Sequence, residues 1–183
     1  SEIAEQLDIS KGIIHNHLST LRELGYVRKI GEGYQLTPML LNIGFQTRSN
    51  SKFYNAAHGS LADVADSLDT GLILSEQAVK DSIVTDVERL PDGLDITIGS
   101  IFSLEKSLVG LVVASSGSQG LPDTDTVPAE YDLATIGKEI STQGYALGPI
   151  SPSISTESVV VPVVDAEDYC TGGVAVLLPP DIS

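Results

Sequence analysis

The chain has 183 residues and a formal net charge of -15, with 25 Asp and Glu against 10 Lys and Arg. This length allows one modest domain and a small additional module, and the acidic excess excludes binding to nucleic acid through overall charge. The single cysteine, Cys170, excludes an internal disulfide and a multi-cysteine zinc site. No apolar run reaches transmembrane length and no signal peptide is visible, so we expect a cytoplasmic protein with no membrane partner.

The acidic residues are unevenly distributed along the chain. Residues 1–52 hold six Lys or Arg and five Asp or Glu, whereas residues 53–183 hold four and twenty. The N-terminal segment is therefore the one that is not acidic. The overall excess is typical of a halophilic protein, because carboxylates keep a surface hydrated at high salt, where their repulsion is screened; an acidic protein from a low-salt cell is the alternative.

The N-terminal segment predicts two helices separated by a turn. The first is short, with an apolar face formed by Ile3, Ala4 and Leu7. Ser10 is a favourable N-cap for a second helix that runs from Lys11 to Leu24, and Gly25 can take the positive φ that ends it. The apolar face of this second helix consists of Ile14, Leu18, Leu21 and Leu24.

A β-hairpin is predicted directly after these helices. Its strands are Tyr26–Ile30 and Tyr34–Leu36, and Gly31-Glu32-Gly33 forms the turn. Two helices followed by a hairpin form a winged helix-turn-helix, which normally places its second helix in the major groove of DNA. A small protein-interaction module is the alternative. Because winged helices normally have a further helix packed behind these two, we expect that helix to be missing before Ser1.

The exposed side of this module supplies the candidate contacts to double-stranded DNA. Asparagine can pair with adenine and isoleucine can contact a thymine methyl, so the candidates for base edges are Lys11, Ile13, His15 and Asn16. The candidates for phosphate contacts are Ser10, Thr20, Arg28 and Lys29.

The stretches SKGIIHNHLSTLRELGYV and GEGYQLTPMLLNIG resemble the DNA-binding half of IclR-type transcriptional regulators. The resemblance implies an α+β architecture: a winged helix in residues 1–37, a linker helix in 38–50, and a GAF-like α/β effector-binding and dimerisation domain in 51–183. It also implies a homodimer or a dimer of dimers. The linker carries the apolar residues that would form dimer contacts, with packing inside the chain as the alternative: Met39, Leu40, Leu41, Ile43 and Phe45.

The remainder of the chain predicts a mixture of helices and strands. The predicted helices are Lys52–Leu68, Ser103–Ala114 and Asp132–Gln143. The predicted strands are Leu72–Ser75, Ser82–Val87, Asp95–Ile98, Ser158–Val164 and Gly172–Leu178, the last two forming a central antiparallel hairpin.

The stretch GSIFSLEKSLVG resembles the family segment that lines one side of an effector pocket, and VVVPVVD and GGVAVLLPP resemble its terminal strands. The resemblance implies a small-molecule pocket formed by Leu104, Ser107, Leu108, Ser158, Val176 and Leu178. The hydroxyls and the thiol with which the family often holds a carboxylate are mostly absent. The pocket therefore takes a more apolar ligand, with Ser107 and Ser158 as its polar contacts, or the domain binds nothing and serves as a dimer core.

No pattern that supports catalysis is present. The chain contains no GxSxG, P-loop, GxGxxG or HExxH motif, and its three histidines do not form a spaced metal site with one cysteine. We therefore expect no enzyme, no metal and no cofactor. The sequence predicts a dimeric transcriptional regulator controlled by a metabolite; the alternative is a dimerisation or protein-interaction regulator whose C-terminal domain binds no ligand.

Overall fold

The computed structural model describes residues 2–116, 124–167 and 169–179. Contacts between residues divide the chain into two compact units, one within residues 1–50 and one within residues 51–183. None of the helices in the described ranges combines the length and the apolar character that crossing a bilayer requires.

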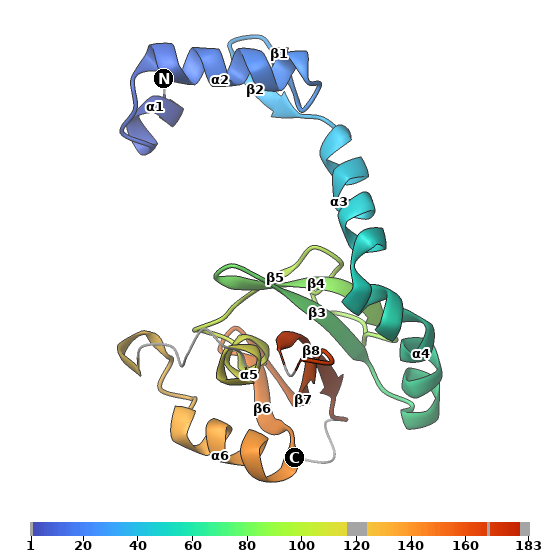
Figure 1. The fold of residues 1–183 in the computed structure, drawn as a ribbon. Helices are drawn as coiled ribbons and strands as arrows, with labels where there is room; N and C mark the ends of the chain where they lie inside the picture. The colour runs from blue at the N-terminus through green and yellow to red at the C-terminus, as the bar shows by residue number, and fades with distance from the viewer. Residues whose placement is uncertain (1, 117–123, 168, 180–183) are drawn as a thin grey trace. The chain divides into compact units, whose positions relative to one another are not determined.

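The N-terminal unit has the predicted order of helix, turn, helix and hairpin (Figure 1). Its elements are α1 (Glu2–Gln6), α2 (Lys11–Glu23), β1 (Val27–Ile30), β2 (Gly33–Leu36) and α3 (Met39–Asn50). The Ser10 hydroxyl accepts a hydrogen bond from the amide of Ile13 at 3.3 Å, which confirms the predicted N-cap. Gly25 follows the helix with a φ of 80°. The hairpin turn is one residue shorter than predicted, because Gly33 already pairs with Ile30.

The buried core of the N-terminal unit is small. Among its described residues, Ala4, Ile14 and Val27 are buried, and α3 has no buried residue at all. Five apolar side chains of α3 are exposed, those of Met39, Leu40, Leu41, Ile43 and Phe45. An apolar surface of this extent normally marks a contact with another element or chain.

The C-terminal unit is built on a curled antiparallel sheet (Figure 1). The strand order is β5-β4-β3-β8-β7-β6. The strands are β3 (Leu72–Ala78), β4 (Asp81–Glu88), β5 (Ile101–Ser103), β6 (Ala146–Ser151), β7 (Ile154–Val164) and β8 (Cys170–Leu177). The predicted hairpin of the last two strands is confirmed, with β8 between β7 and β3.

Helices cover the sheet of the C-terminal unit from both faces (Figure 1). α4 (Lys52–Leu68) packs on β3 and β4, where its side chains meet Leu72 and Leu74. α5 (Leu108–Ser116) packs on the opposite face together with α6 (Leu133–Gln143), against a buried cluster that includes Ile73. Successive strand residues point to opposite faces of the sheet. Ile73 therefore packs in the core under α5, whereas Leu72 and Leu74 pack in the core under α4.

Two predictions for this unit are wrong. Asp95–Ile98 is an irregular loop, in which Ile96 is buried and the amide of Gly99 bonds to the carbonyl of Val84 at 2.8 Å. The alternation of apolar side chains therefore reflects loop packing, and β4 pairs with β5 instead. The helix predicted from Ser103 begins at Leu108, because the Ser107 hydroxyl accepts from the amide of Gly110 at 3.0 Å and caps the helix there.

Candidate nucleic-acid interface and ligand pocket

The candidate base contacts lie on the exposed side of α2. Lys11, Ile13, His15 and Asn16 are all exposed and form the exposed arc of α2. Asn16 lies nearly opposite buried Ile14, Ile13 and His15 lie on either side, and Lys11 lies nearest to Ile14, three residues before it. The charge on this arc is positive at Lys11, and the first acidic side chain of the helix is Glu23 in its last turn. The arc can thus approach DNA without carboxylate repulsion.

The candidate phosphate contacts flank this arc. Ser10 uses its oxygen to accept from the Ile13 amide, which leaves its hydroxyl proton to donate. Thr20 is exposed and donates back to the Asn16 carbonyl at 3.1 Å. Lys29 is exposed on β1.

Arg28 on the wing is held by a side chain that the sequence analysis missed. Its Nε and Nη2 both donate to Oε1 of Gln35, at 3.1 and 2.8 Å. The two residues are direct cross-strand partners. The register of the hairpin would have identified Gln35 as the partner, since a two-residue turn at Gly31-Glu32 places Gln35 opposite Arg28.

The structure does not bring the predicted effector residues together. Leu108 and Ser158 are fully buried in the core under α5, where the Ser158 hydroxyl donates to the Gly148 carbonyl at 3.1 Å. Ser107 caps α5, and Leu104 lies in a separate cluster with Cys170. The polar groups proposed for ligand contact are therefore already engaged within the protein.

The residues of β8 that face the core under α5 are not the ones predicted to line the pocket. Ala175 and Leu177 face the core under α5, whereas Val176 packs in the cluster around α4. Leu178 follows the strand and lines a pocket. The sequence from Val174 to Leu178 does not indicate which residues face which side of the sheet. Both faces of this strand pack against apolar side chains, so apolar and polar residues do not alternate along it.

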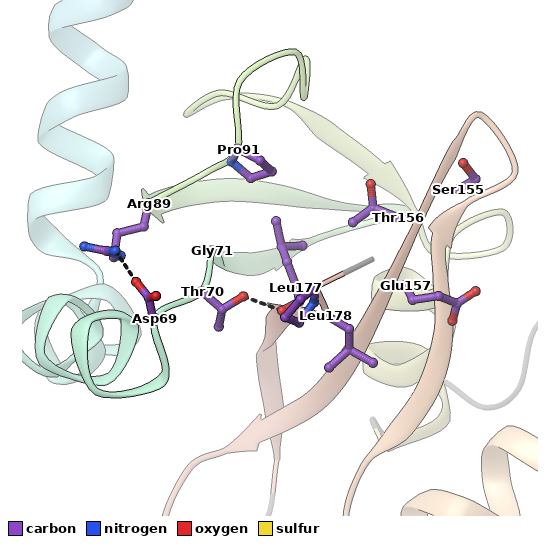
Figure 2. Close-up of a pocket in the computed structure, with 11 residues that line it drawn as sticks. Asp69, Thr70, Gly71, Arg89, Pro91, Ser155, Thr156, Glu157, Leu177 and Leu178 are labelled. Carbon is purple, nitrogen blue, oxygen red and sulfur yellow. Dashed lines mark hydrogen bonds and ion pairs between the residues drawn. The ribbon is translucent and has the colours of Figure 1, made fainter. Parts of the chain in front are cut away.

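A pocket of about 650 Å³ opens where α4, β4, β7 and β8 end or begin (Figure 2). A volume of this size is in the range of small-molecule sites. Leu178 is the one predicted effector residue that borders it. The lining residues are Asp69, Thr70, Gly71, Arg89, Pro91, Ser155, Thr156, Glu157, Leu177, Leu178 and Pro179.

Two contacts define one side of this pocket, and both are drawn in Figure 2. Nη2 of Arg89 lies 2.5 Å from Oδ1 of Asp69, and the Thr70 hydroxyl donates to the Leu177 carbonyl at 2.5 Å. Gly71 lies between them, where a Cβ would lie 2.8 Å from Cδ1 of Leu177 and 3.1 Å from the Arg89 carbonyl oxygen, so a larger residue would displace the Leu177 side chain. The sequence did not indicate Arg89 as a pocket residue, although it is one of only four Lys or Arg after residue 52.

Other groups with chemical potential are engaged in the fold. Burial raises the pKa of the Cys170 thiol, whose Sγ donates to the Gly172 carbonyl at 3.3 Å. Burial also raises the pKa of Tyr131 to about 12, and its hydroxyl donates to the Pro149 carbonyl at 2.9 Å. In the ranges the structure describes, no three His, Cys, Asp or Glu side chains are grouped so that they could hold a metal ion.

Known proteins resemble this chain in sequence at its N-terminus and in fold along its length. Residues 1–29 match the family model described as bacterial regulatory protein, arsR family. No curated protein matches the chain. Similar solved structures are an IclR transcriptional regulator from Alicyclobacillus acidocaldarius, with a TM-score of 0.73 and 20% identity over 100% of this chain and 80% of that one, and an IclR family transcriptional regulator from Brucella abortus, with a TM-score of 0.74 and 22% identity over 97% and 73%.

A third similar structure, the IclR of Thermotoga maritima, has a TM-score of 0.64 and 19% identity over 98% of this chain and 79% of that one. At these identities the likeness concerns the fold. The proteins from A. acidocaldarius and B. abortus are named as transcriptional regulators. The chain thus resembles the IclR-family transcriptional regulators along its whole length and has their fold, a helix-turn-helix unit followed by an α/β unit.

Proposed function

We propose that the chain is a dimeric, sequence-specific DNA-binding transcriptional regulator whose C-terminal unit binds a small-molecule effector. The observation that carries the proposal is the exposed polar arc of the capped helix α2, next to a wing whose Arg28 is held by Gln35. The arc enters the major groove, and Arg28 contacts the phosphate backbone.

The low charge of the N-terminal unit determines how it binds DNA. Residues 1–52 hold six Lys or Arg against five Asp or Glu. The unit therefore neutralises few phosphates, and few counterions are released from the DNA on binding. Binding therefore depends on base-edge contacts from Lys11, Ile13, His15 and Asn16 more than on charge. This balance suits a protein that works at high salt, where counterion release contributes little.

Dimerisation takes place through α3. Its apolar side chains are exposed within the N-terminal unit, and α3 has no buried residue. A second copy would cover them. A dimer presents two α2 helices to half-sites about one turn of DNA apart.

The effector site is the pocket at Arg89, whose volume of about 650 Å³ fits a metabolite. A second candidate, a regulator that binds no ligand, is favoured by one observation. The core under α5, where the resemblance places the pocket, is filled by Leu108, Val160 and Ala175, all fully buried.

The proposal is tested by fluorescence anisotropy with the full chain and the DNA upstream of its own gene, at several KCl concentrations up to molar. We expect specific binding that exceeds binding to a scrambled sequence by at least 10³-fold. Arg28→Ala with Lys29→Ala should flatten the dependence of log K on log salt by up to about two units, about 0.9 for each lost phosphate contact.

Asn16→Ala should lower specific affinity about 5- to 150-fold without changing that slope. Lys138→Ala removes an exposed cation from α6 of the other unit and should change neither quantity. Equal affinity for specific and scrambled DNA would contradict the proposal that the chain is a sequence-specific regulator.

A further inference from the structure

Thr37 connects three parts of the N-terminal unit at one point. Its hydroxyl donates to the carbonyl of Gly25, the residue that follows the C-cap of α2. The same oxygen accepts from the amide of Met39, the first residue of α3, at 3.3 Å. The Thr37 amide donates to the carbonyl of Tyr26, directly before β1, at 2.9 Å. Thr37 therefore forms a joint between the end of α2 and the start of α3.

The two carbonyls that accept from Thr37 are themselves held to the last turns of α2. The Gly25 amide donates to the Arg22 carbonyl at 3.0 Å, and the Tyr26 amide donates to the Leu21 carbonyl at 2.9 Å. Together with the φ of 80° at Gly25, these bonds form a Schellman motif. Gly25 and Tyr26 therefore move with α2, the helix that carries the candidate base contacts.

Side-chain packing does little to fix the direction of α3. The helix has no buried residue, and Met39 and Leu40 in its first turn are exposed. Pro38 precedes the helix and restricts the backbone there, because its ring fixes φ. The hydrogen bonds at Thr37 consequently set the angle between α2 and the start of α3.

This angle matters because α3 acts as a lever. Its 12 residues span about 18 Å. A change of about 10° at the joint would displace the far end of α3 by about 3 Å relative to α2. The rise of one base pair of DNA is about 3.4 Å. In a dimer held through α3, an error of this size would move each α2 off its half-site by about one base pair.

Resting on the proposed function, we infer that Thr37 is a positioning residue for DNA recognition. Its hydroxyl fixes the angle between the helix that reads a half-site and the helix that joins the two protomers. The dimer thereby selects one spacing between half-sites. Thr37 acts through α2 and needs no contact with DNA of its own.

The test uses fluorescence anisotropy with the full chain and the operator that footprinting locates in the DNA upstream of its own gene. Three further DNA molecules are compared with this operator. Two have the half-sites moved apart or together by one base pair, and the third has one half-site scrambled. For the unmodified protein, moving the half-sites should lower affinity about ten-fold or more.

Thr37→Val keeps the branched shape of the side chain but removes the hydroxyl. It should reduce the spacing penalty to about three-fold or less, because the loosened joint lets α2 follow the displaced half-site. Its affinity for the operator with one scrambled half-site should stay within about two-fold of the unmodified protein, because the base contacts of α2 are unchanged. Thr37→Ser keeps the hydroxyl and should restore the penalty.

Thr47→Val is the matched control on α3. The Thr47 hydroxyl donates to the Ile43 carbonyl at 2.9 Å within the helix, so this variant should keep the full spacing penalty. The second readout is hydrogen exchange at the amide of position 37, which bonds to Tyr26. Its exchange should be several-fold faster in Thr37→Val, and it should be unchanged in Thr37→Ser and in Thr47→Val.

Three results would each overturn the inference. They are a spacing penalty in Thr37→Val equal to that of the unmodified protein, an equal loss of affinity for every operator, and unchanged exchange at position 37. The exchange measurement does not involve DNA. Absence of any specific complex with the unmodified protein would contradict the proposed function, whereas specific binding with a spacing penalty that does not depend on the Thr37 hydroxyl would contradict this inference alone.

Discussion

Nδ1 of His58 on α4 lies 2.5 Å from Oδ2 of Asp86 on β4. The Asp86 side chain is 8% exposed and that of His58 is 51% exposed, and the imidazole stacks on the ring of Tyr54 with centroids 4.8 Å apart. A buried carboxylate must have partners, because its desolvation is costly. The pair therefore adds a polar contact to the apolar packing of α4 on the sheet.

Removal of the imidazole should destabilise the C-terminal unit. We expect His58→Ala to lower the free energy of unfolding by about 1–3 kcal/mol, because Asp86 would keep its buried charge without the partner on α4. Urea denaturation followed by circular dichroism measures the change. Asp63→Ala, at an exposed position of the same helix, should stay within about 0.5 kcal/mol of the unmodified protein. Equal effects of the two variants would show that the pair contributes nothing.

Gly110 allows α5 to pack tightly against the end of β5. A Cβ at this position would lie 2.1 Å from the Ser103 carbonyl oxygen and 2.6 Å from Cα of Leu104. Since both atoms belong to the backbone, Gly110→Ala should destabilise by about 3 kcal/mol or more. Gly137→Ala on α6 is the control: its Cβ meets nothing within 4 Å, so better helix propensity should stabilise by up to about 1 kcal/mol. Comparable midpoints of urea unfolding would refute this account.

Asp132 makes part of the stability depend on pH. Its side chain caps α6 by accepting from Thr135 and from the amide of Ala134, and these hydrogen bonds lower its pKa from 3.8. Because the pKa is lower in the folded state, the unfolded state binds the proton more readily. The stabilisation is therefore fully present above pH 3.8 and is lost as the pH falls below it.

The prediction for Asp132 is checked with Asp132→Ala by urea denaturation between pH 3 and pH 7. The difference in unfolding free energy from the unmodified protein should be largest at neutral pH and should shrink toward pH 3. Asp132→Ser keeps a capping oxygen without the carboxylate, so it should be destabilised less at neutral pH and show no titration of its own. A difference for Asp132→Ala that does not change with pH would contradict the assignment.

The elements that sequence predicted well are those with local signals. Ser10 accepts from the amide three residues ahead, and α6 lies within the predicted range Asp132–Gln143, with Asp132 as its N-cap and Gly144 as its C-cap. Each of these signals acts within one or two helical turns. A single sequence therefore contains all the information that they need.

The pocket was not predictable in the same way. Asp69 and Arg89 are twenty residues apart and meet because β3 and β4 pair antiparallel between them. Their register contains a shift between Leu74 and Ser75 that no turn residue indicates. The same reasoning applies to Val176, whose strand packs apolar side chains on both faces. The pocket and the facing of Val176 thus depend on pairing between strands that are distant in the sequence, which local signals do not encode.

Gln35 gives a test of how the wing presents Arg28. Gln35→Leu removes the acceptor for Nε and Nη2 and leaves the charge of the wing unchanged. The released guanidinium must then be ordered on binding, which costs side-chain entropy. We therefore expect specific DNA affinity to fall about two- to ten-fold, while the salt dependence keeps its slope because the number of phosphate contacts is the same.

The matched control is Gln143→Leu at the end of α6 in the other unit, where the exposed side-chain amide donates to the Tyr145 carbonyl at 3.3 Å. It should leave DNA affinity unchanged in the same anisotropy measurement. Gln35→Glu sharpens the distinction, since a carboxylate holds the guanidinium more tightly but also partly neutralises it toward phosphate. If orientation dominates, Gln35→Glu binds better than Gln35→Leu, and if charge dominates it binds worse and flattens the salt dependence. Affinity in Gln35→Leu equal to that of the unmodified protein would show that Arg28 does not depend on Gln35 for its position on DNA.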